Sequence, residues 1–138
     1  MDAESPGQSS AYSETPVVLI ADDEFALRLL VHVTLRSKRY RILEAVDGQE
    51  ALALAQQCRP VLVLLDVNMP GLDGVEVARK IRTDPSLAAT KIVFLTGRLD
   101  PGLEEAAGDA GADHFLTKPF SPVQLLDLVD QIVGAADD

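Results

Sequence analysis

The sequence predicts a single α/β domain, with five parallel strands and five helices. Apolar runs of strand length alternate along the chain with segments of helical length. Repeated strand–helix–strand units connect through right-handed crossovers, which produce a parallel sheet with helices on both faces. The chain has 138 residues, 47% of them hydrophobic, which is enough for one domain with a core of its own.

Five apolar runs have the length of strands. In chain order they are VVLIA at 17–21, YRILEA at 40–45, VLVLLD at 61–66, KIVFLT at 91–96 and DHFLT at 113–117. The first and third runs are almost wholly apolar instead of alternating with polar residues. This pattern is typical of central strands that are buried on both faces of the sheet.

Capping residues mark where the helices between the strands begin. The predicted N-caps are Asp47 and Asp73, each followed three residues later by Glu, then Asp100 before a proline, and Ser121 in a capping box with Gln124. A fifth helix runs from Glu24 to about residue 37. Its apolar arc is wider than a surface helix needs, so most of the arc is expected to pack on the sheet. The alternative is that the edge of the arc is a docking surface.

The helix expected at 101–110 contains two glycines, Gly102 and Gly108. Each costs up to about 1 kcal/mol relative to alanine in a helix. We therefore expect this helix to be the least stable of the five, and elements of low stability are where movement usually occurs.

Residues 1–15 are rich in Ser, Pro, Gly and Gln and contain no Lys or Arg. We expect a flexible N-terminal tail over 1–15, a folded domain over 16–134 and a short C-terminal tail over 135–138. No signal peptide or membrane-spanning run is recognisable, so a cytoplasmic location is expected. The single cysteine, Cys58, excludes a disulfide framework and a thiolate zinc site.

The net charge of −10 makes nucleic acid and anionic membranes poor direct partners for this chain. Aromatic residues make up only 4% of the sequence, so platforms that stack nucleic-acid bases are also improbable. A candidate binding site is instead expected at the carboxyl ends of the strands, where open parallel sheets bind their ligands.

Polar side chains follow four of the predicted strands. The first strand is followed by Asp22 and Asp23, the third ends at Asp66, the fourth at Thr96, and Lys118 follows the fifth. Each residue has an ordinary explanation by itself, such as a helix cap, a turn or a surface lysine. Together they suit one phosphate and metal site, because clustered carboxylates repel unless a cation neutralises them. Hard oxygen ligands in a partly hydrated site favour Mg²⁺.

Four segments resemble response-regulator receiver domains of the chemotaxis CheY type, in the same order and spacing. They are VVLIADDE (17–24), VLVLLDVNMPGLDG (61–74), IVFLTG (92–97) and GADHFLTKPF (111–120), and the resemblance covers about residues 16–134. It implies a flavodoxin-like sheet of order 2-1-3-4-5, with two helices on one face and three on the other. It also implies a signalling switch that catalyses only its own phosphorylation and dephosphorylation, rather than an enzyme.

The resemblance implies a role for each strand-end residue. Asp66 is the expected phosphoacceptor, Lys118 contacts a phosphoryl oxygen, and Thr96 turns toward the phosphoryl group while Phe115 swings inward. A cis peptide bond before Pro119 is expected to place Lys118.

The same resemblance implies a Mg²⁺ site. Asp23 and Asp66 are the expected direct ligands, together with the backbone carbonyl of Asn68, and Asp22 is expected to contribute through water.

The implied phosphoryl donor is a histidine kinase or a histidine phosphotransfer protein. A downstream effector protein is expected to bind the face made by the helix at 101–110, the strand at 113–117 and the last helix. From residue 100 to 138 the chain has nine acidic residues and a single basic one, Lys118. This balance argues against the charged dimer of many DNA-binding relatives.

Other function classes fit less well. An aspartyl-nucleophile phosphohydrolase needs a D-x-D pattern after the first strand, where this chain has DDE. A nucleotide binder needs a phosphate loop there, and ADDEFAL has no glycine. The remaining alternative is a phosphorylation-independent, receiver-like interaction module, against which the retention of Asp22, Asp23, Asp66, Thr96 and Lys118 speaks.

Overall fold

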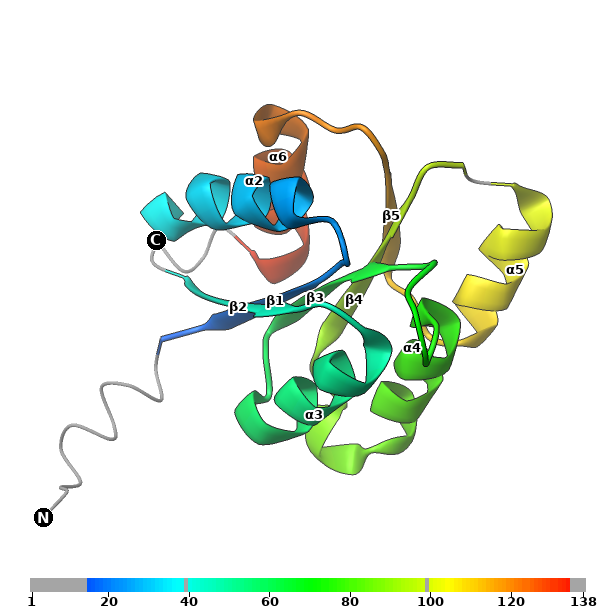
Figure 1. Cartoon of the computed structure of the whole chain (residues 1–138). Helices are drawn as coiled ribbons and strands as arrows, with labels where there is room; N and C mark the ends of the chain where they lie inside the picture. The colour runs from blue at the N-terminus through cyan, green and yellow to red at the C-terminus, as the bar shows by residue number, and fades with distance from the viewer. Residues whose placement is uncertain (1–14, 39, 99, 135–138) are drawn as a thin grey trace, which may run out of the picture.

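The computed structural model describes residues 15–38, 40–98 and 100–134. Apart from Thr15, the predicted tails at 1–15 and 135–138 lie outside the described residues. The described chain forms three layers, with a parallel sheet between two layers of helices (Figure 1). The strand order is β2-β1-β3-β4-β5, which confirms the predicted fold.

The observed bounds agree with the predicted ones to within a few residues. The elements are β1 (Val17–Ala21), α2 (Phe25–Leu35), η1 (Arg36–Lys38), β2 (Arg41–Ala45), α3 (Gly48–Cys58), β3 (Leu62–Asp66), α4 (Gly74–Thr83), η2 (Pro85–Leu87), β4 (Lys91–Thr96), α5 (Pro101–Asp109), β5 (His114–Thr117) and α6 (Pro122–Val133). The two 3₁₀ turns, η1 and η2, were not predicted. The second forms because the Asp84 side chain accepts a hydrogen bond from the Ser86 N–H, and Pro85 fixes the first position of the turn.

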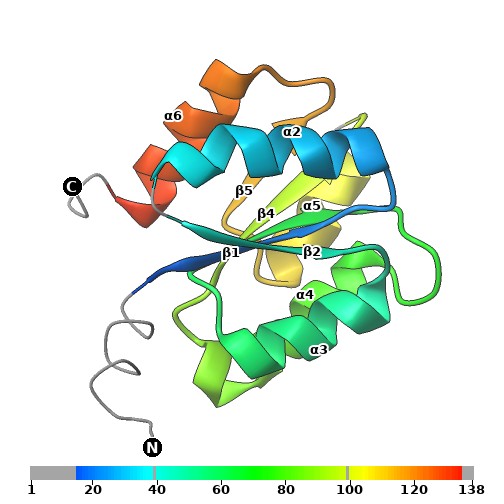
Figure 2. The same ribbon diagram turned by 60° about the vertical axis from the view of Figure 1, so that its left-hand side comes forward.

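The sheet divides the core into two hydrophobic clusters. Helices α2 and α6 cover one face and α3, α4 and α5 cover the other (Figure 2). Alternate residues of β1, β3 and β4 point to opposite faces, so that Val18 and Leu64 belong to one cluster and Leu19 and Leu65 to the other. We call these the α2/α6 cluster and the α3/α4 cluster. All five residues of β1 and of β3 are buried, as predicted for central strands.

The predicted helix caps are confirmed. Asp47, Asp73, Asp100 and Ser121 each accept a hydrogen bond from the third backbone N–H of the following helix. Only Asp73 and Ser121 complete a capping box. Behind Asp47, the Glu50 carboxylate accepts instead from the Val46 N–H at 2.8 Å.

Helix α2 buries only part of its apolar arc. Val31 is buried and Leu27 and Leu30 are half-buried, whereas Ala26, Leu29 and Val33 are exposed. The expectation that most of the arc packs on the sheet therefore holds for half of its six residues.

Helix α5 buries little of its surface, and its predicted low stability stays a prediction. Of its residues only Ala107 is buried, while Leu103 is half-buried against the same face of the sheet. No helix among the residues the structure describes is both long enough and apolar enough to cross a membrane.

Candidate functional site

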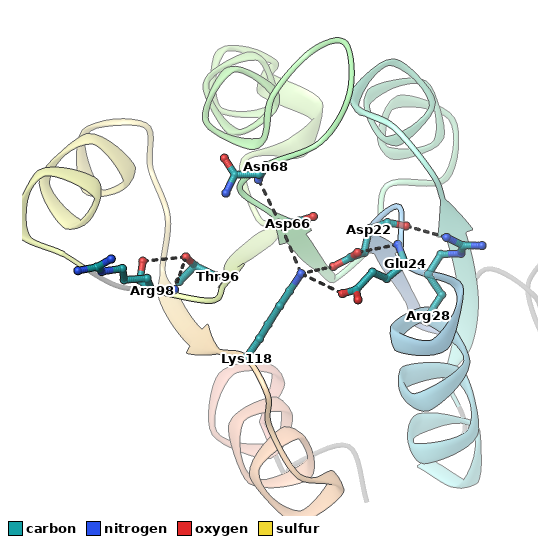
Figure 3. A network of polar contacts seen from close by, with 8 residues as sticks. All are labelled: Asp22, Glu24, Arg28, Asp66, Asn68, Thr96, Arg98 and Lys118. Atoms are coloured by element: carbon teal, nitrogen blue, oxygen red, sulfur yellow. Dashed lines mark hydrogen bonds and ion pairs between the residues drawn. The ribbon is translucent and has the colours of Figure 1, made fainter.

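The carboxyl ends of β1 and β3 lie side by side, because Ala21 pairs with Leu65 in the parallel ladder. The residues that follow these pairing positions, Asp22 and Asp66, are therefore brought together at one edge of the sheet. Lys118 reaches them from the segment after β5 (Figure 3). The structure thus brings together three of the strand-end residues that the sequence singles out, Asp22, Asp66 and Lys118.

Asp22 is fully buried. Its backbone N–H donates to the Ala45 carbonyl at 3.1 Å, and its Oδ1 accepts from the Glu24 N–H at 2.9 Å. This second contact organises the entry to α2, whose N-cap residue, Glu24, makes no side-chain cap. The remaining oxygen, Oδ2, has no hydrogen-bond partner of good geometry, although Lys118 Nζ lies 2.8 Å away as an ion-pair partner. Asp22 therefore carries a buried, incompletely satisfied carboxylate oxygen that faces the site.

Asp66 ends β3 and is 5% exposed. Its Oδ1 accepts a hydrogen bond from the Asn68 N–H at 3.2 Å and lies 3.5 Å from Lys118 Nζ. Burial raises the pKa of Asp66, and the nearby Asp22 charge raises it further, while Lys118 and the Asn68 N–H oppose the shift. Ionised Asp66 is thus held in a site that favours added positive charge.

Lys118 is the cation of the site. Its Nζ contacts Asp22 at 2.8 Å, Asp66 at 3.5 Å and Glu24 at 3.6 Å. Burial alone would lower the Lys118 pKa, but the three carboxylates, Asp22 above all, outweigh it and raise the pKa. The peptide bond to Pro119 is cis, as predicted, and the Lys118 N–H donates to the Thr96 carbonyl at 2.7 Å.

Thr96 ends β4 and is buried, but its hydroxyl is directed at its own loop. It donates to the Arg98 carbonyl and accepts from the Arg98 N–H (Figure 3). Phe115 pairs with Phe94 across the β4–β5 ladder and packs against the α3/α4 cluster with its ring 6.2 Å from that of Phe94. The predicted switch pair therefore occupies neighbouring strands.

Three carboxylates could hold a metal ion. One oxygen each from Asp22, Asp23 and Asp66 can lie within 4.8 Å of the others. Asp23 is exposed and the other two are buried. Carboxylate oxygens of this kind fit a hard divalent cation that keeps part of its water shell. That the backbone carbonyl of Asn68 is a ligand of the metal ion remains a prediction.

Two residues at this edge were missed by the sequence analysis. Arg28 donates from Nη1 to the Asp22 carbonyl at 2.8 Å. Gly74, at the start of α4, lies so close to β3 that a Cβ there would overlap the Asp66 carbonyl oxygen. An arginine one and a half turns after the acidic pair, and a glycine directly after a capping acid, were the available signals. Neither signal is enough to predict the contact, because each contact depends on how the helix packs against the sheet.

The comparisons with known proteins agree with this geometry. The family model of the response regulator receiver domain matches residues 18–130. The transcriptional regulatory protein PdtaR of Mycobacterium tuberculosis is 43% identical over 118 residues, which are 85% of this chain and 56% of that protein. The chain spans about half the length of the first curated relatives it matches.

Solved structures of related proteins have the same fold. The chemotaxis protein CheY4 of Vibrio cholerae has a TM-score of 0.81 and 35% identity, over 86% of this chain and 98% of that one. The receiver domain of the sensor histidine kinase PA1611 of Pseudomonas aeruginosa has a TM-score of 0.79 and 28% identity, over 87% of this chain and 98% of that one. That structure carries a magnesium ion coordinated in its active-site cleft.

The fold and the site are those of receiver domains, which are the signalling switches of two-component systems. The chain belongs to the response regulator receiver domain family. Receiver domains bind Mg²⁺ at a cluster of aspartates, and such a cluster is present here.

Proposed function

We propose that this domain accepts a phosphoryl group on Asp66, with Mg²⁺ held by Asp22, Asp23, Asp66 and the Asn68 carbonyl. The observation that carries the proposal is the meeting of buried Asp22 and Asp66 with Lys118 at the carboxyl edge of the sheet. Asp23 and Asp66 would bind the ion directly and Asp22 through water. Bound there, the ion would neutralise charge on the carboxylates and on the incoming phosphoryl group.

In the proposed reaction, an Asp66 carboxylate oxygen attacks the phosphorus of a phosphohistidine. The new O–P bond forms as the N–P bond breaks, and the electron pair of that bond returns to the imidazole of the donor. Such a transfer depends on positioning and charge stabilisation more than on acid–base chemistry. Lys118, which already lies 3.5 Å from Asp66 Oδ1, would pair with a phosphoryl oxygen. Hydrolysis of the aspartyl phosphate returns the domain to its starting state.

The proposed output is a population shift driven by Thr96. A phosphoryl group adds about two negative charges and strong acceptors. The Thr96 hydroxyl would leave Arg98 to donate to this group, and Phe115 would move inward with it. The segment between them includes α5, which has a single buried residue, so the change would be expressed on the surface of α5, β5 and α6. An effector protein would read that surface.

The proposed donor is a histidine kinase or a histidine phosphotransfer protein. Phosphohistidine has a high transfer potential, and the acidic edge described above is suited to take its phosphoryl group once Mg²⁺ is bound. The exposed position of Asp23, in contrast with buried Asp66, gives the ion a route from solvent.

Phosphorylation by acetyl phosphate with Mg²⁺ tests the proposal. We expect one phosphoryl group per chain, detected by mass spectrometry, and no labelling after Asp66→Asn or in EDTA. Asp23→Ala should weaken Mg²⁺ binding, because it removes a direct ligand. Asp127→Asn is the matched control, since Asp127 is an exposed aspartate on α6.

Labelling that persists in Asp66→Asn would move the acceptor to another residue. A chain that binds neither acetyl phosphate nor beryllofluoride in Mg²⁺ would instead be a phosphorylation-independent interaction module.

A further inference from the structure

The Arg28 side chain reaches back over the first turn of α2 to the functional site. Its Nη1 donates to the Asp22 carbonyl at 2.8 Å, and its Nε donates to Glu44 Oε1 at 3.0 Å (Figure 3 shows the first contact). Only 12% of the Arg28 side chain is exposed. The other oxygen of Glu44 lies 3.2 Å from His32 Nδ1. Arg28 is thus fixed between the β1–α2 loop and the edge strand β2.

These contacts complete the fixation of Asp22. Its N–H is held by Ala45 and its Oδ1 by the Glu24 N–H, both through backbone groups. Its carbonyl is held by Arg28, which among the described residues is the only polar contact of Asp22 with another side chain besides the Lys118 ion pair at Oδ2. With the peptide and Oδ1 fixed in this way, Oδ2 is the oxygen of Asp22 that remains directed at the site.

We infer that Arg28 is a positioning residue for the Asp22 carboxylate, and that Glu44 in turn positions Arg28. The inference rests on the proposed function for its consequence, which is tighter Mg²⁺ binding. Arginine suits this place because its planar fork can donate to a carbonyl and a carboxylate at the same time. Glu44 also balances the Arg28 charge, so the guanidinium does not oppose a cation at the neighbouring acidic cluster.

Arg82 provides a matched control. It also joins backbone carbonyls to a carboxylate, with donors to Gly111, Thr90 and Asp113 at 3.0, 2.7 and 3.0 Å. These partners lie before β4 and β5, at the amino edge of the sheet, opposite the functional site. Loss of either arginine should lower overall stability, but only loss of Arg28 should disturb Asp22.

The experiment compares the full chain with Arg28→Gln, Arg28→Lys and Arg82→Gln. The first readout is amide hydrogen exchange of Glu24, whose N–H donates to Asp22 Oδ1, relative to Leu64 in the centre of the sheet. The second is Mg²⁺ affinity, from an NMR titration. We expect Arg28→Gln to lower Mg²⁺ affinity about tenfold, which is the order seen when residues behind metal ligands are removed.

In the same variant the relative exchange of Glu24 should rise, while Arg82→Gln leaves both readouts at the wild-type level. Arg28→Lys should be intermediate, because an ammonium cannot serve the carbonyl and Glu44 with the same geometry. Wild-type exchange and affinity in Arg28→Gln would overturn the inference, as would equal losses in Arg82→Gln. A wild-type chain that binds no Mg²⁺ would overturn the proposed function instead, and the exchange of Glu24 would still decide whether Arg28 positions Asp22.

Discussion

The Thr96 hydroxyl is bound twice by the backbone of Arg98. It donates to the Arg98 carbonyl at 2.9 Å and accepts from the Arg98 N–H at 3.1 Å. A move toward Asp66 would give up both hydrogen bonds, each with a net value of about 0.5–1.5 kcal/mol. A hydrogen bond to a charged phosphoryl oxygen is roughly twice as strong as a neutral one. The two arrangements are therefore close enough in free energy for phosphorylation to decide between them.

We predict that Thr96→Ala accepts a phosphoryl group but does not transmit the change. The hydroxyl is needed to read the phosphoryl group and not to attack phosphorus, so labelling by acetyl phosphate should persist. NMR shifts around Phe115 on phosphorylation should shrink strongly relative to the wild type. Thr96→Ser, which keeps the hydroxyl, is the matched control. Equal shifts near Phe115 in wild type and Thr96→Ala would contradict this role.

The raised pKa of Asp66 predicts a pH-dependent stability. Burial, followed by the Asp22 charge, makes ionisation of Asp66 less favourable in the folded chain than in the unfolded one. The stability that the protonated acid contributes is present below its ordinary value of 3.8 and is lost as pH rises through the raised folded pKa. Without Mg²⁺ at pH 7, Asp66→Asn should therefore melt at a higher temperature than the wild type.

Thermal unfolding between pH 3.5 and pH 8 would measure this difference, which should narrow toward the acid end. Asp127→Asn serves as the control, since this exposed residue lies away from the site and should change the profile little. Added Mg²⁺ should stabilise the wild type and not Asp66→Asn. A variant that melts below the wild type at pH 7 without metal would show that Asp66 contributes more through Lys118 than it loses through burial.

Gly74 and Gly97 should respond differently to alanine. A Cβ on Gly74 would overlap the Asp66 carbonyl oxygen and lie 2.9 Å from the Val67 Cα, whereas a Cβ on Gly97 would meet nothing within 4 Å. Overpacking of this kind costs about 1–3 kcal/mol, so Gly74→Ala should lower stability and displace Asp66. Gly97→Ala should leave the unfolding free energy within about 0.5 kcal/mol of wild type. Denaturant unfolding of both variants would test the contrast.

The acidic character of α5, β5 and α6 predicts that activation does not produce a charge-paired dimer through this face. The sequence from residue 100 onward has nine acidic residues and one basic residue, Lys118, which is engaged at the site, and five of the nine acids lie on α5 and α6. A twofold axis would bring two such faces together, and like charges across an interface are repulsive. Sedimentation of the beryllofluoride-activated chain at low and high salt would test this, and any dimer that forms should not have its contacts on this face. A tight dimer whose contacts run through α5, β5 and α6 would refute the prediction.

The parts of the site that the sequence predicts are those set by strand ends. Once parallel strands are recognised, Asp22 and Asp66 must lie at the same edge, and no further knowledge of packing is needed. Arg28 is different, because its contact with Asp22 depends on which way a long side chain folds across a helix turn. Its partner Glu44 comes from a strand that is adjacent only in the folded sheet. The same holds for Gly74, whose role depends on how closely α4 approaches β3.

The sequence pattern leaves open whether the edge of the apolar arc on α2 is buried or exposed. The spacing of Leu29 and Val33 predicts a buried face, but periodicity cannot say how wide a surface the sheet offers to each helix. Nor could it predict that Glu50 turns to Val46 instead of completing a capping box with Asp47. Such choices depend on the local path of the backbone before the helix.

The sheet separates the side chains of the core into two clusters, one on each face. A buried leucine or isoleucine replaced by alanine costs about 2–5 kcal/mol, and Leu35 and Ile81 lie in different clusters. Because Leu35 and Ile81 belong to separate clusters, the free-energy costs of the two substitutions should add. Each face also supports a different part of the site, since Phe120 anchors the Lys118 segment in the α2/α6 cluster and Val67 anchors the Asp66 loop in the α3/α4 cluster. Substitutions on one face of the sheet should therefore need no compensating substitutions on the other face, provided that Phe120 and Val67 are kept.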